Sequence, residues 1–327
     1  MIEFGWLTEP LQLTFMQHAY LAIIMVGIIS GVTGVFVTLR GLAFMGDAIS
    51  HAVFPGVVIA FLTGGNFLIG ALIAAVIVSS LIGAVSQSSK LSNDTAIGVF
   101  FAGAFALGIA LISAQRTYTR DLNSFLLGSI LGVSRDDLLL TGIVGLIVLA
   151  VVLLFRRELT TVAFDRTFAR STGLSLWRYD QLFLIMLSLA IVISLQTVGN
   201  ILVLAMLVTP AATARLLTDR LRTMIVISAL LGAASGVTGL TISYHAGIAS
   251  GASVVLVATG IFLITYLFAP KTGLITAAIR RRLHYAHPEE DTFADDLELP
   301  ASPEAERTLA TTAAAVGISD RKPDPLA

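Results

Sequence analysis

The chain has 327 residues, of which 56% are hydrophobic and 13% charged, and its mean hydropathy is +0.90. Soluble domains are about 45–50% apolar and about 25% charged, so this composition excludes an ordinary soluble enzyme or binding domain. The formal net charge of −1 gives no indication of a nucleic-acid partner, and none is expected. Because cysteine is absent, disulfides, thiolate metal sites and cysteine catalysis are excluded.

Long apolar runs recur along the chain, separated by short polar connections. A bilayer core needs about 20 apolar residues per helix, and the short alternating strands of a β-barrel do not fit these runs. The sequence therefore predicts an all-α, polytopic transmembrane helix bundle of about 8–9 spans. The predicted spans are 15–39, 44–63, 67–87, 94–113, 138–156, 180–197, 200–217, 223–243 and 252–269. The apolar segment 122–133 is too short to cross and is expected to be re-entrant or broken.

Basic residues in the connections determine the predicted orientation. With the C-terminus inside, fourteen Lys and Arg residues fall on the cytoplasmic side and three on the outer side. A multi-pass location in the cell membrane with a cytoplasmic C-terminus follows, and nine spans would place the N-terminus outside. Residues 1–282 are expected to form the membrane domain. Residues 283–327 are rich in Asp and Glu and are expected to be a disordered cytoplasmic tail.

Two pairs of glycines suggest a close helix contact. Gly27 and Gly31 in the first span, and Gly232 and Gly236 in a late span, have the spacing that lets membrane helices approach closely.

One pair of ionisable side chains lies inside a predicted span. Asp47 and His51 are four residues apart, which on a helix is about 40° of rotation and about 6 Å of rise. Both therefore point to one face, with Ser50 beside them. Ionisable groups within a membrane are functional candidates by default, and a carboxylate with an imidazole suits Zn²⁺, Mn²⁺ or Fe²⁺. The alternative is that the pair only locks helix packing by a hydrogen bond.

Pro55 follows His51 by four residues, so the His51 carbonyl loses its helical donor and a kink is expected. This frees a backbone oxygen near the two candidate ligands. Pro210 similarly frees the Met206 carbonyl, although most membrane prolines only shape packing. Asn200 and Gln196 are interpreted as interhelical hydrogen-bonding groups.

The connection from Arg156 to Tyr179 is the longest polar stretch before the tail. Phe164, Phe168 and Leu174 give it a small apolar face, and Gly173 is a helix stop. A short amphipathic helix at the cytoplasmic surface is expected, which would either enforce topology or dock a cytosolic partner. The sequence contains no Walker-type phosphate loop, so ATP hydrolysis by that route is excluded.

The stretch from Leu39 to Gly56, LRGLAFMGDAISHAVFPG, resembles the second-helix signature of the permease subunits of ABC importers for manganese, zinc or iron, the ABC-3 family. The resemblance extends from about His18 to Ile275. It implies that Asp47 and His51 line the metal pathway. It also implies a coupling helix at about 164–174 that docks on the ATPase subunit, carried by Phe164, Asp165, Arg166, Phe168, Ala169, Gly173 and Leu174.

The stretch 124–129 is similar to a segment near the gate of the more distant vitamin B12 and siderophore permeases. This likeness suggests a gate at Leu127 and Gly128, to which Thr209 and Pro210 are added as candidates.

The family resemblance implies a homodimeric permease that imports Mn²⁺, Zn²⁺ or Fe²⁺. Its partners would be a cytoplasmic ABC ATPase dimer, where ATP acts, and an extracytoplasmic metal-binding protein. The chain itself would hold no catalytic site and no permanent cofactor. The main alternative is a stand-alone, ion-coupled secondary transporter, which would keep Asp47 and His51 but need no docking helix. A membrane enzyme using the two side chains as a base pair lacks a third catalytic group.

Overall fold

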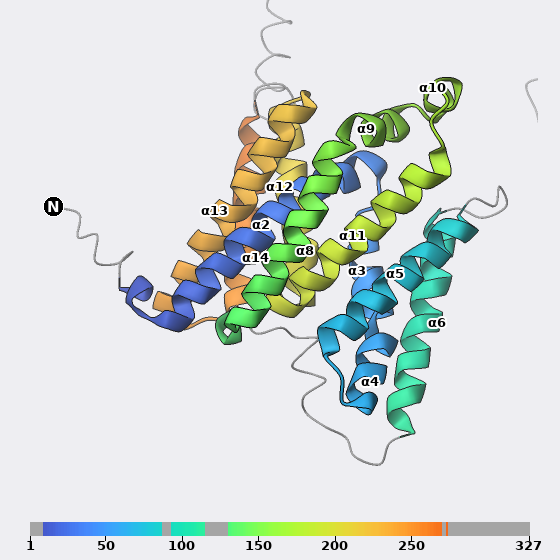
Figure 1. Ribbon diagram of the computed structural model, residues 1–327. Helices are drawn as coiled ribbons and strands as arrows, with labels where there is room; N and C mark the ends of the chain where they lie inside the picture. The colour runs from blue at the N-terminus through green and yellow to red at the C-terminus, as the bar shows by residue number, and fades with distance from the viewer. Residues whose placement is uncertain (1–8, 87–92, 115–129, 270–272, 274–327) are drawn as a thin grey trace, which may run out of the picture. The chain divides into compact units, whose positions relative to one another are not determined.

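The computed structural model describes residues 9–86, 93–114, 130–269 and 273. Over this part of the chain, helices are the only regular secondary structure (Figure 1), which confirms the predicted all-α bundle. The predicted tail 283–327 lies outside the described residues. The helices are η1 (Pro10–Gln12), α2 (Thr14–Arg40), α3 (Met45–Ala52), α4 (Phe54–Thr63), α5 (Phe67–Val85), α6 (Asn93–Ser113), η2 (Ile130–Gly132), α8 (Arg135–Leu154), α9 (Arg156–Phe164), α10 (Arg166–Ser171), α11 (Leu176–Val198), α12 (Asn200–Leu217), α13 (Leu221–Ala246) and α14 (Ser250–Phe268).

Each predicted span corresponds to a helix or to a pair of helices. Among the described residues, 8 helical segments are long and apolar enough to cross a membrane, and α12 contributes a shorter apolar helix. The predicted range of spans is therefore confirmed. Of the segment expected to be re-entrant, only the end is described, where η2 is a short 3-10 helix.

Helix boundaries differ from the predicted ones where polar residues cap a helix. α8 begins three residues before the predicted span because Ser134 and Asp137 form a capping box, in which the Ser134 hydroxyl accepts from the Asp137 N–H at 3.2 Å. The predicted span 44–63 is divided into α3 and α4 at Val53, two residues before Pro55. Proline at the start of α4 favours a new helix over continuation of the old one.

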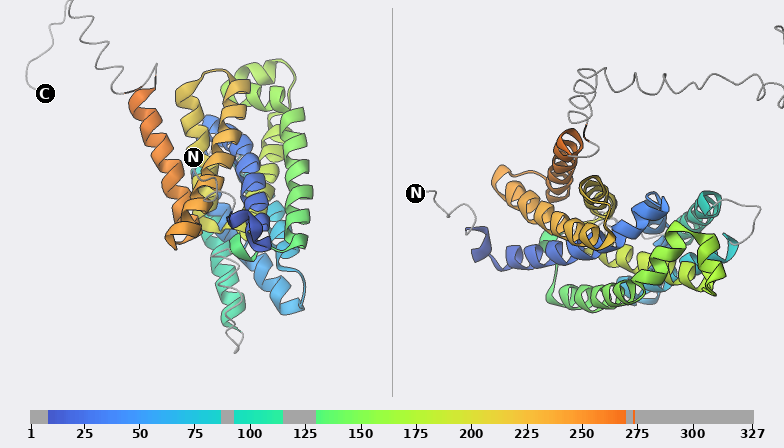
Figure 2. Two further views of the ribbon diagram at one scale, coloured as in Figure 1. Left: turned by 90° about the vertical axis from the view of Figure 1, so that its left-hand side faces the viewer. Right: turned by 90° about the horizontal axis from the view of Figure 1, so that it is seen from above.

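α2 is the central helix of the bundle. It packs against α13 and α12 on one side and against α8 and α11 on the other (Figure 2). The contact with α13 is close because both helices lack side chains there: a Cβ on Gly27 would lie 2.7 Å from the backbone of Gly232. The Ser228 hydroxyl adds a hydrogen bond to the Gly31 carbonyl at 2.7 Å. The glycine contact predicted from spacing is therefore confirmed.

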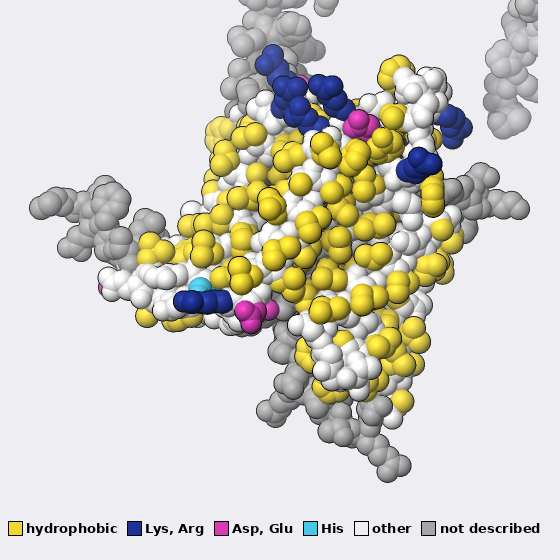
Figure 3. Space-filling view, viewed as in Figure 1, with side chains coloured by type: hydrophobic (Ala, Val, Ile, Leu, Met, Phe, Trp, Pro, Cys, Tyr) yellow, Lys and Arg dark blue, Asp and Glu magenta, His cyan; other side chains and the backbone are white. Residues whose placement is uncertain are grey.

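Charged side chains gather at one end of the helices. Figure 3 shows most of the dark-blue Lys and Arg side chains at the upper end of the molecule, above a broad apolar surface. This end comprises the C-terminal end of α2, the short helices α9 and α10, and the start of α13. The distribution agrees with the excess of basic residues predicted for a cytoplasmic face.

Candidate metal pathway and coupling site

Asp47 and His51 lie in the first and last turns of α3. The preceding turn contains Gly41 at φ 69°, a left-handed conformation that suits glycine and lets the chain reverse direction after α2. The His51 Nε2 atom lies 3.6 Å from Asp47 Oδ1, which is beyond a good hydrogen bond. The Asp47 side chain is 48% exposed and that of His51 is 30% exposed. The two side chains share one face as predicted, but they do not bond each other tightly.

Asn200 joins this pair from another helix. It is the first residue of α12 and follows Gly199, whose φ of 82° allows the chain to turn sharply between α11 and α12. Its Nδ2 atom lies 3.1 Å from His51 Nε2 and 3.4 Å from Asp47 Oδ1. Asn200 is thus the interhelical hydrogen-bonding residue that the sequence predicted. The sequence contained no signal for its partners, because they lie about 150 residues away along the chain.

The cluster of Asp47, His51 and Asn200 retains unused polar atoms. Within the part of the chain that the structure describes, the buried atoms His51 Nδ1 and Asn200 Oδ1 have no hydrogen-bond partner. Buried polar atoms normally have one, so this cluster has spare capacity for a ligand. A carboxylate, an imidazole and an amide together form a mixed nitrogen and oxygen donor set. Among the described residues no group of three or more His, Cys, Asp and Glu could hold a metal ion, so the donor set is sparse.

Aromatic rings from α6 cover His51. Its imidazole meets the rings of Phe101 and Phe105 edge-on, with centroids 5.7 Å and 5.4 Å away. Phe105 also contacts Phe54 at the start of α4, with a centroid distance of 5.8 Å. These contacts fix the orientation of the imidazole and keep one side of the cluster dry.

Ser50 and Pro55, the predicted supporting residues, lie close by in the chain but outside the cluster. The Ser50 side chain is buried and donates to the Gly46 carbonyl at 2.8 Å, so its hydroxyl is engaged with its own helix. Pro55 is the second residue of α4, and the helix is interrupted before it. The predicted kink is thus a complete break, and the role of the His51 carbonyl stays a prediction.

The connection between α8 and α11 contains two short helices, of which the second, α10, lies within the predicted coupling segment. α9 ends at Phe164 and α10 begins at Arg166, because the carboxylate of Asp165 caps α10 by accepting from the N–H groups of Thr167 and Phe168 at 2.9 and 2.8 Å. The helix expected at about 164–174 corresponds to α10, which is shorter than the predicted range, and its coupling role stays a prediction. The Phe164 and Phe168 side chains are 66% and 56% exposed.

The far side of α10 anchors it to the bundle. Ala169 is fully buried, and the Leu174 N–H bonds to its carbonyl at 3.0 Å. Gly173, at φ 81°, supplies the left-handed residue that ends the helix. This segment therefore exposes two phenylalanine side chains on a backbone that is held in place by the buried side of α10.

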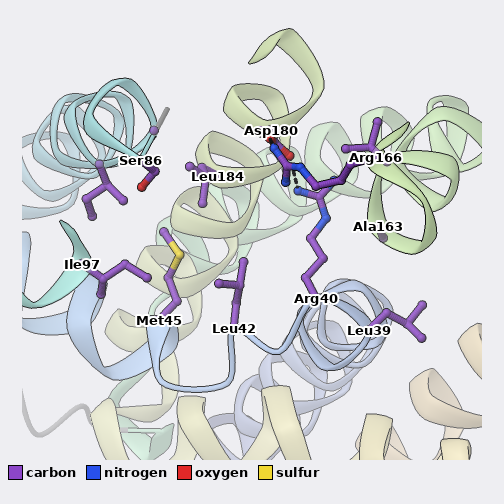
Figure 4. Close-up of a pocket in the computed structure, with 13 residues that line it drawn as sticks. Leu39, Arg40, Leu42, Met45, Ser86, Ile97, Ala163, Arg166, Asp180 and Leu184 are labelled. Atoms are coloured by element: carbon purple, nitrogen blue, oxygen red, sulfur yellow. Dashed lines mark hydrogen bonds and ion pairs between the residues drawn. The ribbon is translucent and has the colours of Figure 1, made fainter. Parts of the chain in front are cut away.

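An ion triad joins α10 to the rest of the bundle (Figure 4). Asp180, near the start of α11, accepts from Arg40 Nη1 with Oδ1 at 2.8 Å and from Arg166 Nη2 with Oδ2 at 2.7 Å. Arg40 ends α2, its side chain is 9% exposed, and its guanidinium lies 4.4 Å from the centroid of the Phe183 ring. These residues border a cavity of about 240 Å³ that also contains Met45 from the start of α3. The sequence analysis predicted Arg166 as a coupling residue but not the other two members of the triad.

The candidate gate residues are only partly described. Thr209 and Pro210 lie within α12, where the Thr209 carbonyl accepts from the Thr213 hydroxyl at 2.7 Å. Leu127 and Gly128 lie outside the described residues. The gate assignment stays a prediction.

Several relatives of the chain are membrane proteins of bacterial metal transport systems. The manganese transport system membrane protein MntC of Halalkalibacterium halodurans is 49% identical over 268 residues, which cover 82% of this chain and 92% of that protein. The manganese import system permease protein ScaB of Streptococcus gordonii is 43% identical, with coverage of 81% and 95%. A probable iron transport system membrane protein of Haemophilus influenzae is 39% identical, with coverage of 83% and 95%.

Solved structures show the same arrangement of helices. A chain of PsaBC from Streptococcus pneumoniae, solved in complex with Fab, matches with a TM-score of 0.72 and 39% identity, covering 82% of this chain and 96% of that one. An inward-facing putative metal-chelate type ABC transporter matches with a TM-score of 0.61 at 18% identity, which is a likeness of fold alone. Residues 12–269 match the ABC 3 transport family. The chain therefore belongs to the ABC-3 family of transport proteins.

Proposed function

We propose that this chain is the membrane-spanning permease of an ATP-driven importer that carries a divalent transition metal, foremost Mn²⁺, into the cytoplasm. The observation that carries the proposal is the cluster of Asp47, His51 and Asn200. Two of its members lie on α3, which is interrupted before α4, in a helix bundle of the ABC-3 family. The manganese transport proteins among its relatives support Mn²⁺ as the cargo. The similarity to a probable iron transport protein makes Fe²⁺ a second candidate cargo. The chain itself is a transport subunit, and ATP hydrolysis belongs to a partner.

The donor set suits an ion in transit. Asp47 supplies the negative charge that offsets the dehydration of a divalent ion, and His51 favours transition metals over Ca²⁺ and Mg²⁺, which prefer oxygen ligands alone. Asn200 now donates to both, and its free carbonyl oxygen offers a neutral third donor after a rotation of the amide. Each chain contributes one carboxylate from the described residues of this cluster, so binding stays weak enough for release.

The exposure of Asp47 supports a homodimer. A carboxylate that is 48% exposed on the single chain is costly against lipid but not against a water-filled pathway or a second protomer. Two copies that face each other across this surface enclose the path between their α3 helices. An extracytoplasmic metal-binding protein would deliver the ion to the outer mouth of that path.

The coupling to ATP is assigned to α10. Its exposed Phe164 and Phe168 form an apolar contact for a cytoplasmic ABC ATPase, and the triad of Arg40, Asp180 and Arg166 links α10 to α2. Arg40 is followed directly by the turn that leads to α3, so movement of α10 reaches the metal ligands through this triad. With α10 on the cytoplasmic side, the C-terminus is cytoplasmic as well.

Metal uptake into proteoliposomes tests the proposal. The vesicles contain the chain with its ATPase, loaded binding protein is supplied at the outer face, and ATP is supplied at the ATPase face. ATP-dependent uptake of Mn²⁺ that is lost in Asp47→Ala and in Phe164→Asp is expected. Uptake that ignores ATP and Phe164→Asp but follows a proton gradient would instead assign the chain to the secondary transporters.

A further inference from the structure

Four arginines converge on one cleft at the basic end of the bundle. Arg156 and Arg157 open α9, while Arg220 and Arg222 flank the first residue of α13. Together with Leu221 and three threonines, they line a cleft of about 560 Å³. The threonines are Thr160, Thr161 and Thr223. This cleft is separate from the cavity beside Arg40 and from the exposed phenylalanines of α10.

The four cleft arginines form no ion pair among the described residues. The ion pairs of the described residues lie elsewhere and involve Arg40, Arg166 and His51. No Asp or Glu lines the cleft, although Glu158 and Asp219 are neighbours in the sequence. Two helices also begin here, so their first N–H groups add positive potential. Four guanidinium groups at such a place favour an anion that can bridge α9 and α13.

The surface next to the cleft is apolar and exposed. Leu154, which ends α8 just before Arg156, is 74% exposed, and Leu230 of α13 is 64% exposed. On α13, Arg222 is followed at helical spacing by the exposed residues Val226 and Leu230, so a charged group and an apolar stripe share one face. Figure 3 shows the same relation, with dark-blue side chains at the upper end bordered by yellow surface. A ligand with an anionic head and an apolar chain matches both parts.

We propose that the cleft of Arg156, Arg157, Arg220 and Arg222 binds the phosphate headgroup of an anionic phospholipid of the cytoplasmic leaflet. The guanidinium groups hold the phosphate oxygens by paired hydrogen bonds, and the acyl chains lie against Leu154, Val226 and Leu230. Basic pockets between membrane helices on this side bind lipid headgroups by this chemistry. The bound lipid ties α9, and hence the segment before α10, to the start of α13. This inference does not depend on which ion the protein carries.

Native mass spectrometry of the full-length protein in detergent tests the site. The protein is titrated with phosphatidylglycerol and, separately, with phosphatidylcholine of the same acyl chains. Phosphatidylglycerol is expected to bind more tightly, and Arg156→Gln with Arg222→Gln, one change on each helix, should weaken it at least about tenfold. Lysine at the same two positions keeps the charge but loses the paired hydrogen bonds, so it should recover part of the affinity.

The matched control is Arg170→Gln with Arg178→Gln. Both arginines are exposed at the same end of the bundle and line neither cavity, so this variant should bind phosphatidylglycerol as the unsubstituted protein does. Equal weakening in cleft and control variants would overturn the site, as would no weakening in the cleft variant. Competition by inorganic phosphate at the same concentration as the lipid would show a free-anion site instead. Loss of ATPase co-purification with unchanged lipid binding would show a protein contact there.

Discussion

Two aspartates of this bundle, Asp180 and Asp47, differ in how closely they contact their partners. Asp180 has one oxygen 2.8 Å from Arg40 and the other 2.7 Å from Arg166. Among the described residues, Asp47 has His51 at 3.6 Å and Asn200 at 3.4 Å as its polar partners, and nearly half of its side chain is exposed. A carboxylate with both oxygens engaged by arginines holds helices together, whereas one with long contacts keeps its lone pairs for a cation. The length of the contacts and the charge of the partners, rather than the residue type, distinguish Asp180 from Asp47, the aspartate that we propose to bind the ion.

The largest effect is expected for Asp180→Ala. The substitution leaves the buried guanidinium of Arg40 without a carboxylate, and two of its nitrogens already have no hydrogen-bond partner among the described residues. Removing one member of a buried ion pair typically costs about 3–5 kcal/mol of stability. Thermal unfolding in detergent should show a large fall in Tm, with a smaller fall for Asp180→Asn, which keeps one hydrogen bond. An unchanged Tm would mean that Asp180 does not hold the bundle together.

Asp47→Ala should have the opposite effects to Asp180→Ala, with a large loss of uptake and no change in Tm. Uptake of Mn²⁺ should fall at least about a hundredfold because each chain loses the carboxylate that we propose to face the ion. The Tm should stay unchanged, since the side chain is half exposed and weakly bonded. The control is Asp136→Ala, an exposed carboxylate of α8, which should alter neither property. A large loss of Tm in Asp47→Ala would place Asp47 in the same structural class as Asp180.

Substitutions of Asn200 test whether its amide contributes to ion binding at the cluster of Asp47, His51 and Asn200. Asn200→Ala should weaken Mn²⁺ binding about tenfold, as expected when a group that orients a ligand is lost. Asn200→Asp adds a second carboxylate, so binding should tighten while uptake slows, because the ion is released less readily. Calorimetric affinity and vesicle uptake measure the two effects separately. Parallel changes in affinity and uptake for both variants would argue against a transit site.

The smallest effect is expected for the exposed arm of the triad. Arg166 is 58% exposed, and an exposed ion pair contributes about 0.2–1 kcal/mol, so Arg166→Ala should leave folding intact. If this arm transmits movement of α10, uptake per ATP hydrolysed should fall a few-fold, with Arg166→Lys close to normal. Arg170→Ala, on the same short helix, is the control. Equal ratios of uptake to hydrolysis in both alanine variants would assign transmission to another contact.

The class of architecture and the candidate metal site could be predicted from the amino-acid sequence alone. Long apolar runs require helices that satisfy their own backbone hydrogen bonds in lipid, so the bundle follows from composition alone. The four-residue spacing of Asp47 and His51 placed them on one helical face, and the glycine spacing anticipated the contact of α2 with α13. These features depend on neighbours within a turn or two, where helical geometry is fixed.

The packing of whole helices determines which distant residues complete each site. Asn200 reaches His51 across 149 positions of sequence, and Asp180 reaches Arg40 across 140. Neither pairing has a periodic signal, because it depends on how whole helices pack and on where Gly199 and Gly41 turn the chain. The division of the coupling segment at Asp165 was also missed, since an aspartate within a polar loop looks the same whether or not it caps a helix. Local spacing is encoded in the backbone geometry, whereas the partners of a buried charge are chosen by packing.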